Sequence, residues 1–522
     1  MNLSTTKREW FQHADFALVL AVAAIAVRVL WPGINAPIWL DEQMIAMNVR
    51  DRGFTRLVGQ LDNDQSAPLG WLWVERALFN LFGQADWVLR LQPLVFGVGA
   101  VVVAWWFGRR WLGRLGSTAL VALIGFNWAT MLYSSQIKHY SADIFWALLL
   151  IALARWVIEE PHSYRRHLWW WGAAVVGSWL SNGATTSTPG IALVLVTIAV
   201  WRQPFLTWVK MAVPGVVWLG SFAAHYISHL RVASQNEYLN EFWASLGYPP
   251  PSEGKRDTLI WFANQVTSLL HETFYLDIRL PPTPAARSIF VVFSALAAAG
   301  LVVAFHRGKA FGFVLCAPLI TASLLSLLRI VPLFGRLAFW TIPAVMVAVA
   351  HAVDFKPQRF KAMRWVAPVA FLLMLVPFVN SVRELVKTPE FDDRAAITWL
   401  RERHRTGDLT LIIANSYQAA EWYDGEKQLS PVYMVTSVPA GPDCDPAQLR
   451  EIVRGHDRAL VYAGVRLFPY METPALLETQ LATMGTVTER QRFGTDGVTY
   501  VVELSRSTSP GVTLSPDCIK IL

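Results

Sequence analysis

The stretch Tyr140-Ser-Ala-Asp-Ile-Phe-Trp-Ala-Leu-Leu-Leu-Ile-Ala-Leu-Ala-Arg-Trp-Val157 decides the fold class of this chain. It is apolar over nearly the length that an α-helix needs to cross a bilayer, about 20 residues. Asp143 lies near its beginning and Arg155 near its end. A helix is the expected spanning element, because lipid offers the backbone no hydrogen-bond partner. The stretch therefore predicts a membrane-spanning helix with a polar end.

Apolar runs of similar length recur on both sides of this stretch. Hydrophobic residues make up 54% of the 522 residues and charged residues 16%, whereas soluble domains carry about 25% charged residues. The sequence thus predicts an all-α polytopic membrane protein with about eleven transmembrane helices. We place the spans at 15–31, 87–107, 115–133, 140–157, 168–181, 185–201, 207–229, 288–305, 310–328, 335–353 and 364–382.

The net charge of +7 follows from membrane orientation and gives no indication of nucleic-acid binding. The basic residues cluster in short loops beside the spans, as loops retained in the cytoplasm do. The clusters are Arg109, Arg110 and Arg114, then Arg155, Arg165 and Arg166, then Lys356, Arg359, Lys361 and Arg364. With Lys7 and Arg8 inside, this pattern predicts a multi-pass protein of the cell membrane. The long loops 32–86 and 230–287 and the tail 383–522 are then extracytoplasmic.

The outside segments carry structure of their own. In the first outside loop we predict surface-lying helices from Asp41 to Arg52 and from Leu69 to Phe82, the second with Pro68 in its first turn. A third is expected from Thr258 to His271. The tail alternates β-rich runs (409–414, 459–465 and 498–504) with helical ones (445–454 and 473–484), which predicts a small α/β domain. The predicted domains are 1–382 and 383–522. Cys444 and Cys518 in the tail are equally compatible with a disulfide and with free thiols.

Two polar groups in the first outside loop are candidates for chemistry. Asp41 and Glu42 are adjacent at the start of a predicted helix, so their side chains point about 100° apart. One carboxylate could serve a reaction while the other caps or orients; simple helix capping by Asp41 is the alternative. The second group is Asp62, Asp64 and Gln65, for which an ordinary polar turn is the alternative.

Two further groups lie at the extracytoplasmic ends of later spans. The segment 133–143 contains the polar side chains Tyr133, Gln136, Lys138, His139, Tyr140 and Asp143. His139 and Asp143 share a helix face at i,i+4 spacing, and a cation there suits a phosphate. Arg336 opens the span 335–353 on the outside, where a guanidinium and free helix N–H groups together bind phosphate well. Snorkelling of Lys138 or Arg336 to the interface is the alternative.

The four groups are predicted to converge on one membrane face. A carboxylate there could deprotonate an acceptor hydroxyl as a general base, and cations could stabilise a departing phosphate. This combination suits sugar transfer from a lipid-linked phosphate sugar.

The motifs resemble those of a known family. Trp39-Leu-Asp-Glu42, Asp62-Asn-Asp-Gln-Ser-Ala-Pro68, Leu81-Phe-Gly-Gln-Ala-Asp-Trp-Val-Leu-Arg-Leu91, Tyr133-Ser-Ser-Gln-Ile-Lys-His-Tyr-Ser-Ala-Asp143 and Phe334-Gly-Arg-Leu337 are similar to GT-C glycosyltransferases of the protein-mannosyltransferase and aminoarabinose-transferase type. The likeness covers about residues 15–350. It departs from the family at Ala67-Pro68, where many members have a double proline.

The resemblance implies a polyprenyl-phosphate sugar donor, an extracytoplasmic active site, inversion at the sugar carbon and no required metal, although a divalent metal is compatible with it. It assigns Asp41 as the catalytic carboxylate with Glu42 beside it, and Lys138 and Arg336 as ligands of the lipid phosphate. The acceptor is a glycan, a lipid or a protein.

Two other functions stay open. A secondary transporter of a lipid or an anionic solute would place polar groups near the bilayer midplane in broken helices, and Asn182, Gly183 and His225 are the residues that favour it. A non-catalytic membrane scaffold is the third possibility.

Overall fold

The computed structural model describes residues 3–30, 32–201, 203–250, 254–274, 284–355, 391–413, 416–425, 427–430, 432–435, 451–464, 478, 481–505 and 519–521. The chain divides into two compact units. A helical unit comprises Met1–Ile34 and Arg52–Leu385, and a C-terminal unit comprises Val386–Leu522 together with Asn35–Asp51. The grouping thus differs from the predicted domains 1–382 and 383–522 in the placement of residues 35–51.

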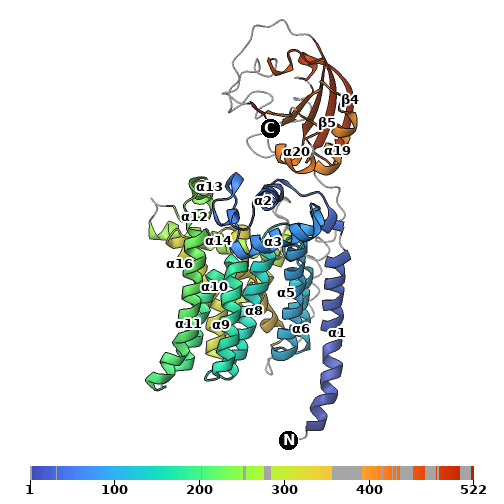
Figure 1. Cartoon of the computed structure of the whole chain (residues 1–522). Coiled ribbons are helices and arrows are strands. Elements are labelled where there is room, and N and C mark those ends of the chain that lie inside the picture. The colour runs from blue at the N-terminus through green and yellow to red at the C-terminus, as the bar shows by residue number, and fades with distance from the viewer. Residues whose placement is uncertain are drawn as a thin grey trace. The chain divides into compact units, whose positions relative to one another are not determined.

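The helical unit is a bundle of long apolar helices, most of which run alongside one another (Figure 1). Its longer helices are α1 (Leu3–Leu30), α3 (Leu69–Phe82), α5 (Leu91–Trp111), α6 (Arg114–Phe126), α8 (Tyr140–Glu159), α9 (Tyr164–Leu180), α10 (Asn182–Val200), α11 (Phe205–His225), α13 (Glu237–Gly247), α14 (Lys255–Phe274), α15 (Pro284–Arg307), α16 (Lys309–Leu327) and α17 (Ile342–Val353). Its short helices are α4 (Asp86–Leu89), α7 (Trp128–Leu132) and α12 (Arg231–Ser234), the 3₁₀ turns η1 (Pro32–Asn35), η2 (Arg56–Val58), η3 (Asp62–Asp64) and η5 (Gly335–Thr341), and the π-helical turn η4 (Tyr226–Leu230).

Among the residues that the structure describes, seven helices are long and apolar enough to cross a membrane. They are Asp86–Trp111, Tyr140–Glu159, Asn182–Val200, Phe205–Ser234, Phe290–Arg307, Lys309–Leu327 and Gly335–Val353. The shorter apolar helices Phe16–Leu30 and Arg114–Phe126 match two more predicted spans, and α9 matches the predicted span 168–181. The last predicted span, 364–382, lies outside the described residues. The chain is an integral membrane protein, and the count of eleven spans stays a prediction.

The predicted span 115–133 is a broken helix. It consists of α6 and α7, which are separated at Asn127. Asn127 caps α7, because its side-chain oxygen accepts from the N–H groups of Ala129 and Thr130. The carbonyls at the end of α6 are bound by Arg28 of α1, which donates to Ile124 O at 2.9 Å and to Gly125 O. Because lipid cannot satisfy carbonyls that a break releases, this buried arginine stabilises the break.

The C-terminal unit is an α/β domain, as the sequence predicts. Its elements are α2 (Leu40–Asp51), α19 (Asp393–Arg403), β1 (Leu409–Ile413), α20 (Tyr417–Tyr423), β2 (Val432–Val435), β3 (Arg458–Ala463), β4 (Gly485–Phe493), β5 (Gly497–Leu504) and β6 (Ile519–Ile521). They form one six-stranded sheet in the order β4-β5-β3-β1-β2-β6. The strands β2, β1 and β3 are parallel, whereas β5, β4 and β6 join antiparallel.

Successive side chains of a strand point to opposite faces of its sheet. Nearly every residue of β1 and β3 is buried, so both faces are covered at these central strands. Leu411 and Val461 pack on one face beside Ile452, and Ile412 and Leu460 pack on the other beside α19 and α20. Strand β4 was not predicted, because most of its side chains are exposed and polar. The predicted helices 445–454 and 473–484 lie largely outside the described residues, as do Cys444 and Cys518.

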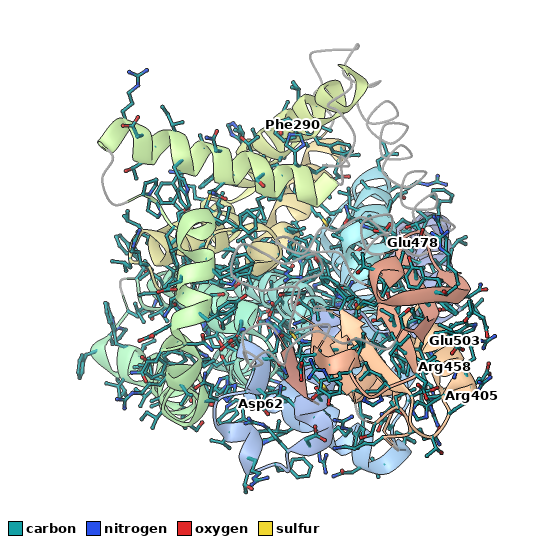
Figure 2. All side chains as sticks on the ribbon, turned by 90° about the horizontal axis from the view of Figure 1, so that it is seen from above. Asp62, Phe290, Arg405, Arg458, Glu478 and Glu503 are labelled. Carbon is teal, nitrogen blue, oxygen red and sulfur yellow. The ribbon has the colours of Figure 1, made fainter. Side chains whose placement is uncertain are left out.

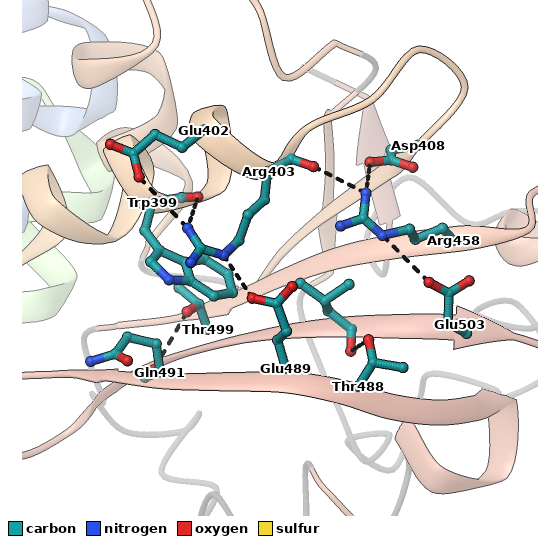
Figure 3. Close-up of polar contacts among 11 residues, drawn as sticks. Trp399, Glu402, Arg403, Asp408, Arg458, Thr488, Glu489, Gln491, Thr499 and Glu503 are labelled. Carbon is teal, nitrogen blue, oxygen red and sulfur yellow. Dashed lines mark hydrogen bonds and ion pairs between the residues drawn. The ribbon is translucent and has the colours of Figure 1, made fainter.

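Charged side chains join β3 and β4 to α19 and to the residues that follow this helix (Figure 3). Arg458 pairs with Asp408 at 2.6 Å and both are buried. Arg403 of α19 lies 4.0 Å from the ring centroid of Trp399 and 2.8 Å from the Glu489 carboxylate of β4. These contacts fix α19 and β4 against the sheet.

Candidate active site

The polar segment 133–139 joins α7 to α8 without a regular helix, and Lys138 is its last residue but one. The Lys138 side chain is buried, and its Nζ donates a 2.8 Å hydrogen bond to Gln65 Oε1 of the first loop. A buried ammonium group at the end of a spanning helix is costly unless it has polar partners. Snorkelling to water therefore does not describe Lys138, and two predicted site residues 73 positions apart are in direct contact.

Asp143, in the first turn of α8, binds the beginning of α10. Its Oδ1 accepts a hydrogen bond from Ser181 Oγ at 2.6 Å and another from Gly183 N at 2.8 Å. Ser181 Oγ in turn accepts from Ala184 N and so caps α10. Acidic groups suit a helix N-terminus, where free N–H groups and the helix dipole favour negative charge. Asp143 therefore joins two spanning helices at one end.

His139 lies beside this junction. Its Nε2 is 3.6 Å from Asp143 Oδ2 and 3.2 Å from Asn182 Nδ2. The i,i+4 neighbours His139 and Asp143 thus meet, as their spacing predicts. Gly183 allows the close approach, because a Cβ there would collide with Trp340 Cβ and lie 3.0 Å from Asp143 Cβ.

Arg336 lies beside a cluster of aromatic rings through Tyr140. Its guanidinium carbon lies 5.8 Å from the ring centroid of Tyr140, a cation–π distance. Tyr140 and Phe339 both pack edge-on against Tyr133, with centroids 5.0 and 4.9 Å away. The ring centroids of Tyr140 and His139 are 4.9 Å apart. Arg336 is the second residue of the 3₁₀ turn η5 that leads into α17, so it lies at a helix beginning as predicted.

The first-loop segment 57–69 is held by the end of α11 and the residues after it. Asn236 Nδ2 donates to Asp64 Oδ1 at 2.9 Å. His229 in the π-helical turn places one ring nitrogen 2.8 Å from Ala67 O and the other 3.1 Å from Val58 O. His225 Nε2 accepts from Leu69 N. Pro68 is the residue before α3, so its predicted place in the first turn was wrong by one position.

Asp62 differs from its neighbours in being exposed on the first-loop segment (Figure 2). It forms a bidentate ion pair with Arg52, whose Nε donates to Asp62 Oδ2 at 3.1 Å and whose Nη2 donates to Asp62 Oδ1. Asn63 and Asp64 have φ values of 58° and 51°, the left-handed region that Asn and Asp tolerate better than most residues. The turn therefore sends Asp62 outward and Asp64 toward Asn236.

Asp41 and Glu42 belong to the C-terminal unit, in the first turn of α2. Glu42 is buried, and its Oε2 accepts a 3.1 Å hydrogen bond from Trp39 N, the N–H just before the helix. This is the glutamate half of a capping box. Glu42 therefore fills the capping role that was expected of one carboxylate of the pair. Asp41 is partly exposed, and its catalytic role stays a prediction.

Within the helical unit, the structure brings several predicted residues together around the beginning of α8. They are Gln65, Tyr133, Lys138, His139, Tyr140, Asp143 and Arg336. Gln136 enters this region through its carbonyl, which accepts from Lys138 N at 2.7 Å. Six residues that were not predicted for this site also contribute contacts to it: Ser181, Asn182, Gly183, His225, His229 and Asn236. A serine directly before an apolar helix is a capping signal, so Ser181 carried a readable sign.

The three residues that favoured a transporter, Asn182, Gly183 and His225, form hydrogen bonds within the helical unit. Asn182 and Gly183 contact His139 and Asp143, and His225 binds the first turn of α3. Across the described ranges, no group of three or more His, Cys, Asp or Glu side chains is arranged to hold a metal ion. Independence of a metal stays a prediction.

No family model and no curated protein matches this chain. Among solved structures, ArnT from Cupriavidus metallidurans in the apo state aligns with 93% of this chain and 97% of its own, with TM-score 0.52 and 14% identity. The chain has the GT-C fold. The Archaeoglobus fulgidus oligosaccharyltransferase aligns with 81% of this chain and 68% of its own, with TM-score 0.48 and 12% identity. The mycobacterial arabinofuranosyltransferase AftD aligns with 94% of this chain and 42% of its own, with TM-score 0.48 and 14% identity. The GT-C likeness to ArnT extends through both compact units.

Proposed function

We propose that this chain is a membrane glycosyltransferase that moves a sugar from a polyprenyl-phosphate donor to an extracytoplasmic acceptor. The observation that carries the proposal is the buried Lys138 just before the beginning of α8, held by Gln65 and close in sequence to the Asp143 junction. The GT-C fold supports the reaction class, and a structure of ArnT with undecaprenyl phosphate bound motivates the choice of donor.

In the proposed reaction, the acceptor oxygen attacks the anomeric carbon of the sugar while the bond from that carbon to the phosphate oxygen breaks. The phosphate leaves with the bonding electrons, so its charge grows. Lys138 and Arg336 bind it, and this interaction is strongest in the transition state. Asp41 takes the acceptor proton as general base, while Glu42 caps the helix. The attack inverts the configuration, and no metal is required.

The proposed orientation follows the distribution of basic loops. The N-terminus is cytoplasmic, and the site and the C-terminal unit are extracytoplasmic. Tyr133, Gln136, His139 and Tyr140 are proposed to line the donor side with Gln65 and Asp64, whereas Asp143 holds α8 and α10 together. The acceptor is a glycan, a lipid or a protein.

The first experiment tests the base. Purified full-length Asp41→Asn is reconstituted in liposomes and compared with wild type for release of polyprenyl phosphate from a panel of polyprenyl-phosphate pentoses and hexoses. Loss of a general base slows such reactions by about 10²- to 10⁴-fold. Asp51→Asn, at the far end of α2 and paired with Arg50, is the matched control. Wild-type turnover by Asp41→Asn removes Asp41 from the mechanism.

The second experiment tests the phosphate site with undecaprenyl phosphate itself as the ligand. Lys138→Ala and Arg336→Ala should each weaken binding by roughly tenfold or more, because a hydrogen bond to a charged group contributes about 1.5–3 kcal/mol. Lys309→Ala, an exposed cation at the beginning of α16, should bind as wild type does. Unchanged affinity in both test variants contradicts the assignment.

A further inference from the structure

Residues 35–51 form part of the C-terminal unit although some 340 residues separate them from it in sequence. Most of helix α2 is buried, and Leu40, Ile45, Ala46 and Val49 are at most 5% exposed. The helix packs along α20. At its C-terminal end, Arg50 donates to Glu421 O at 2.6 Å and covers the Trp422 ring.

The beginning of α2 is held by a chain of buried polar contacts. Gln43 Nε2 donates to Ile38 O at 2.7 Å and to Asp393 Oδ2 at 2.6 Å. The other Asp393 oxygen accepts from Tyr462 OH. Ile38 N donates to Tyr423 OH at 2.9 Å. Gln43, Asp393 and Tyr462 are each 0% exposed.

These contacts lie where an α/β sheet binds its ligands. Strand β1 pairs with β2 on one side and with β3 on the other. The chain therefore leaves β1 toward β2 and later returns to the opposite side of β1 to form β3. Ligands of such sheets bind at the carboxyl ends of strands next to a change of direction. Tyr462 is the last residue but one of β3. Here a segment of the same chain, the beginning of α2, is bound through it.

Burial makes the hydrogen bonds of Asp393 with Gln43 and Tyr462 costly to break. Burial is the main cause that raises the pKa of Asp393 to about 6, and the hydrogen bonds from Tyr462 and Gln43 oppose it. Burial and the Asp393 charge raise the pKa of Tyr462 well above its usual range, so the hydroxyl keeps its proton and donates. A buried carboxyl group that loses a donor is left unsatisfied, which is more costly than an exposed loss. Asp393 and the Ile38 carbonyl therefore hold the Gln43 amide nitrogen at the beginning of α2.

We infer that Asp393 is a positioning residue, which acts through Gln43 and with Tyr462 to fix the first turn of α2 and so the Asp41 carboxylate. This inference rests on the proposed role of Asp41 as base. Asp41 lies two residues before Gln43 in that turn, and the Glu42 cap fixes the residue between them. A general base must lie within hydrogen-bond reach of its proton, and a misplacement of about 1 Å costs about 10²-fold in rate.

The test uses Gln43→Leu, Tyr462→Phe and Asp393→Asn in the full-length protein. Asp393→Asn keeps an oxygen for Tyr462 but turns an amide toward the Gln43 amide. Two matched controls perturb the same sheet away from α2. Tyr500→Phe removes a hydroxyl that donates to Glu478 at 3.1 Å, and Asp408→Asn removes the negative charge of the buried partner of Arg458 (Figure 3).

Two readouts separate positioning from general stability. Hydrogen exchange of peptides from 38–51 should accelerate at least tenfold in the three variants and stay at the wild-type rate in the controls. Turnover of the polyprenyl-phosphate sugar should fall about 10- to 100-fold in kcat with the donor KM unchanged. In the Asp41→Asn background, the three substitutions should cause no further loss, because they act through Asp41.

The outcomes distinguish the inference from the function on which it rests. If Asp41→Asn is inactive while Gln43→Leu and Tyr462→Phe keep wild-type kcat and exchange, the positioning role is wrong and the base survives. If Asp41→Asn turns over normally, the base assignment fails first. Equal losses of kcat in the controls and the test variants would show a general effect of unit stability and overturn the inference.

Discussion

The two regions that carry the candidate chemistry are assembled in different ways. At the beginning of α8, Lys138, His139 and Asp143 are close in sequence, and spanning helices bring partners such as Ser181 to them. At the beginning of α2, Gln43 donates a hydrogen bond to Asp393, which lies 350 residues away in sequence. Both residues belong to the C-terminal α/β unit. Helix periodicity within one segment makes the first region visible in sequence. The second depends on contacts that no local pattern encodes.

The comparison predicts that breaking the α8 junction has the largest effect on stability. Asp143→Ala leaves the Ser181 hydroxyl and the Gly183 N–H buried without their acceptor. Each unsatisfied donor costs about 1–3 kcal/mol, so the helical unit should lose on the order of 2–6 kcal/mol. Thermal unfolding of the purified protein in detergent measures this loss. Asp143→Asn, which retains an accepting oxygen, should recover most of it, and a wild-type midpoint for Asp143→Ala contradicts the junction.

The stability of the C-terminal unit, which contains α2, should depend on pH through Asp393. The pKa of Asp393 is raised to about 6, so the folded unit binds this proton more tightly than the unfolded chain, whose Asp pKa is about 3.9. The stabilisation is complete below about pH 4 and is lost as pH rises through 6. Amide exchange of α19 and β3, corrected for its intrinsic pH dependence, should therefore accelerate by up to roughly 100-fold across this window.

Asp393→Asn is the control for this pH dependence. It should flatten the response between pH 4 and 6, whereas Asp408→Asn should keep it. A slope that survives Asp393→Asn assigns the response to another group, of which the neighbouring Asp392 is the first to consider.

Close packing at the α8 junction gives a smaller and purely steric prediction. Gly183→Ala should destabilise the helical unit by about 1–3 kcal/mol, because its new methyl group collides with the Trp340 Cβ. Gly172→Ala in α9 meets no atom of the described residues within 4 Å and should stabilise by roughly 0.5–1 kcal/mol through its helix propensity. Unfolding midpoints of the two variants that shift in the same direction would refute the steric explanation.

The smallest effect is expected at Asp62. Its ion pair with Arg52 is exposed, and exposed pairs contribute about 0–1 kcal/mol. Asp62→Ala should therefore unfold like the wild type. A large rise in the donor KM of this stable variant then supports the predicted substrate-binding role of Asp62, and an unchanged KM contradicts it.

The sequence by itself determined the membrane class, most of the helix positions, the β-rich tail and the local pair His139 and Asp143. These follow from apolar length and from the 3.6-residue period, which are properties of short segments. Only the tertiary structure decided that Glu42 caps α2, that Lys138 binds Gln65 and that residues 35–51 belong with the C-terminal sheet. The physical reason is that a buried polar group must find a partner, and the chain supplies it from residues that are distant in sequence.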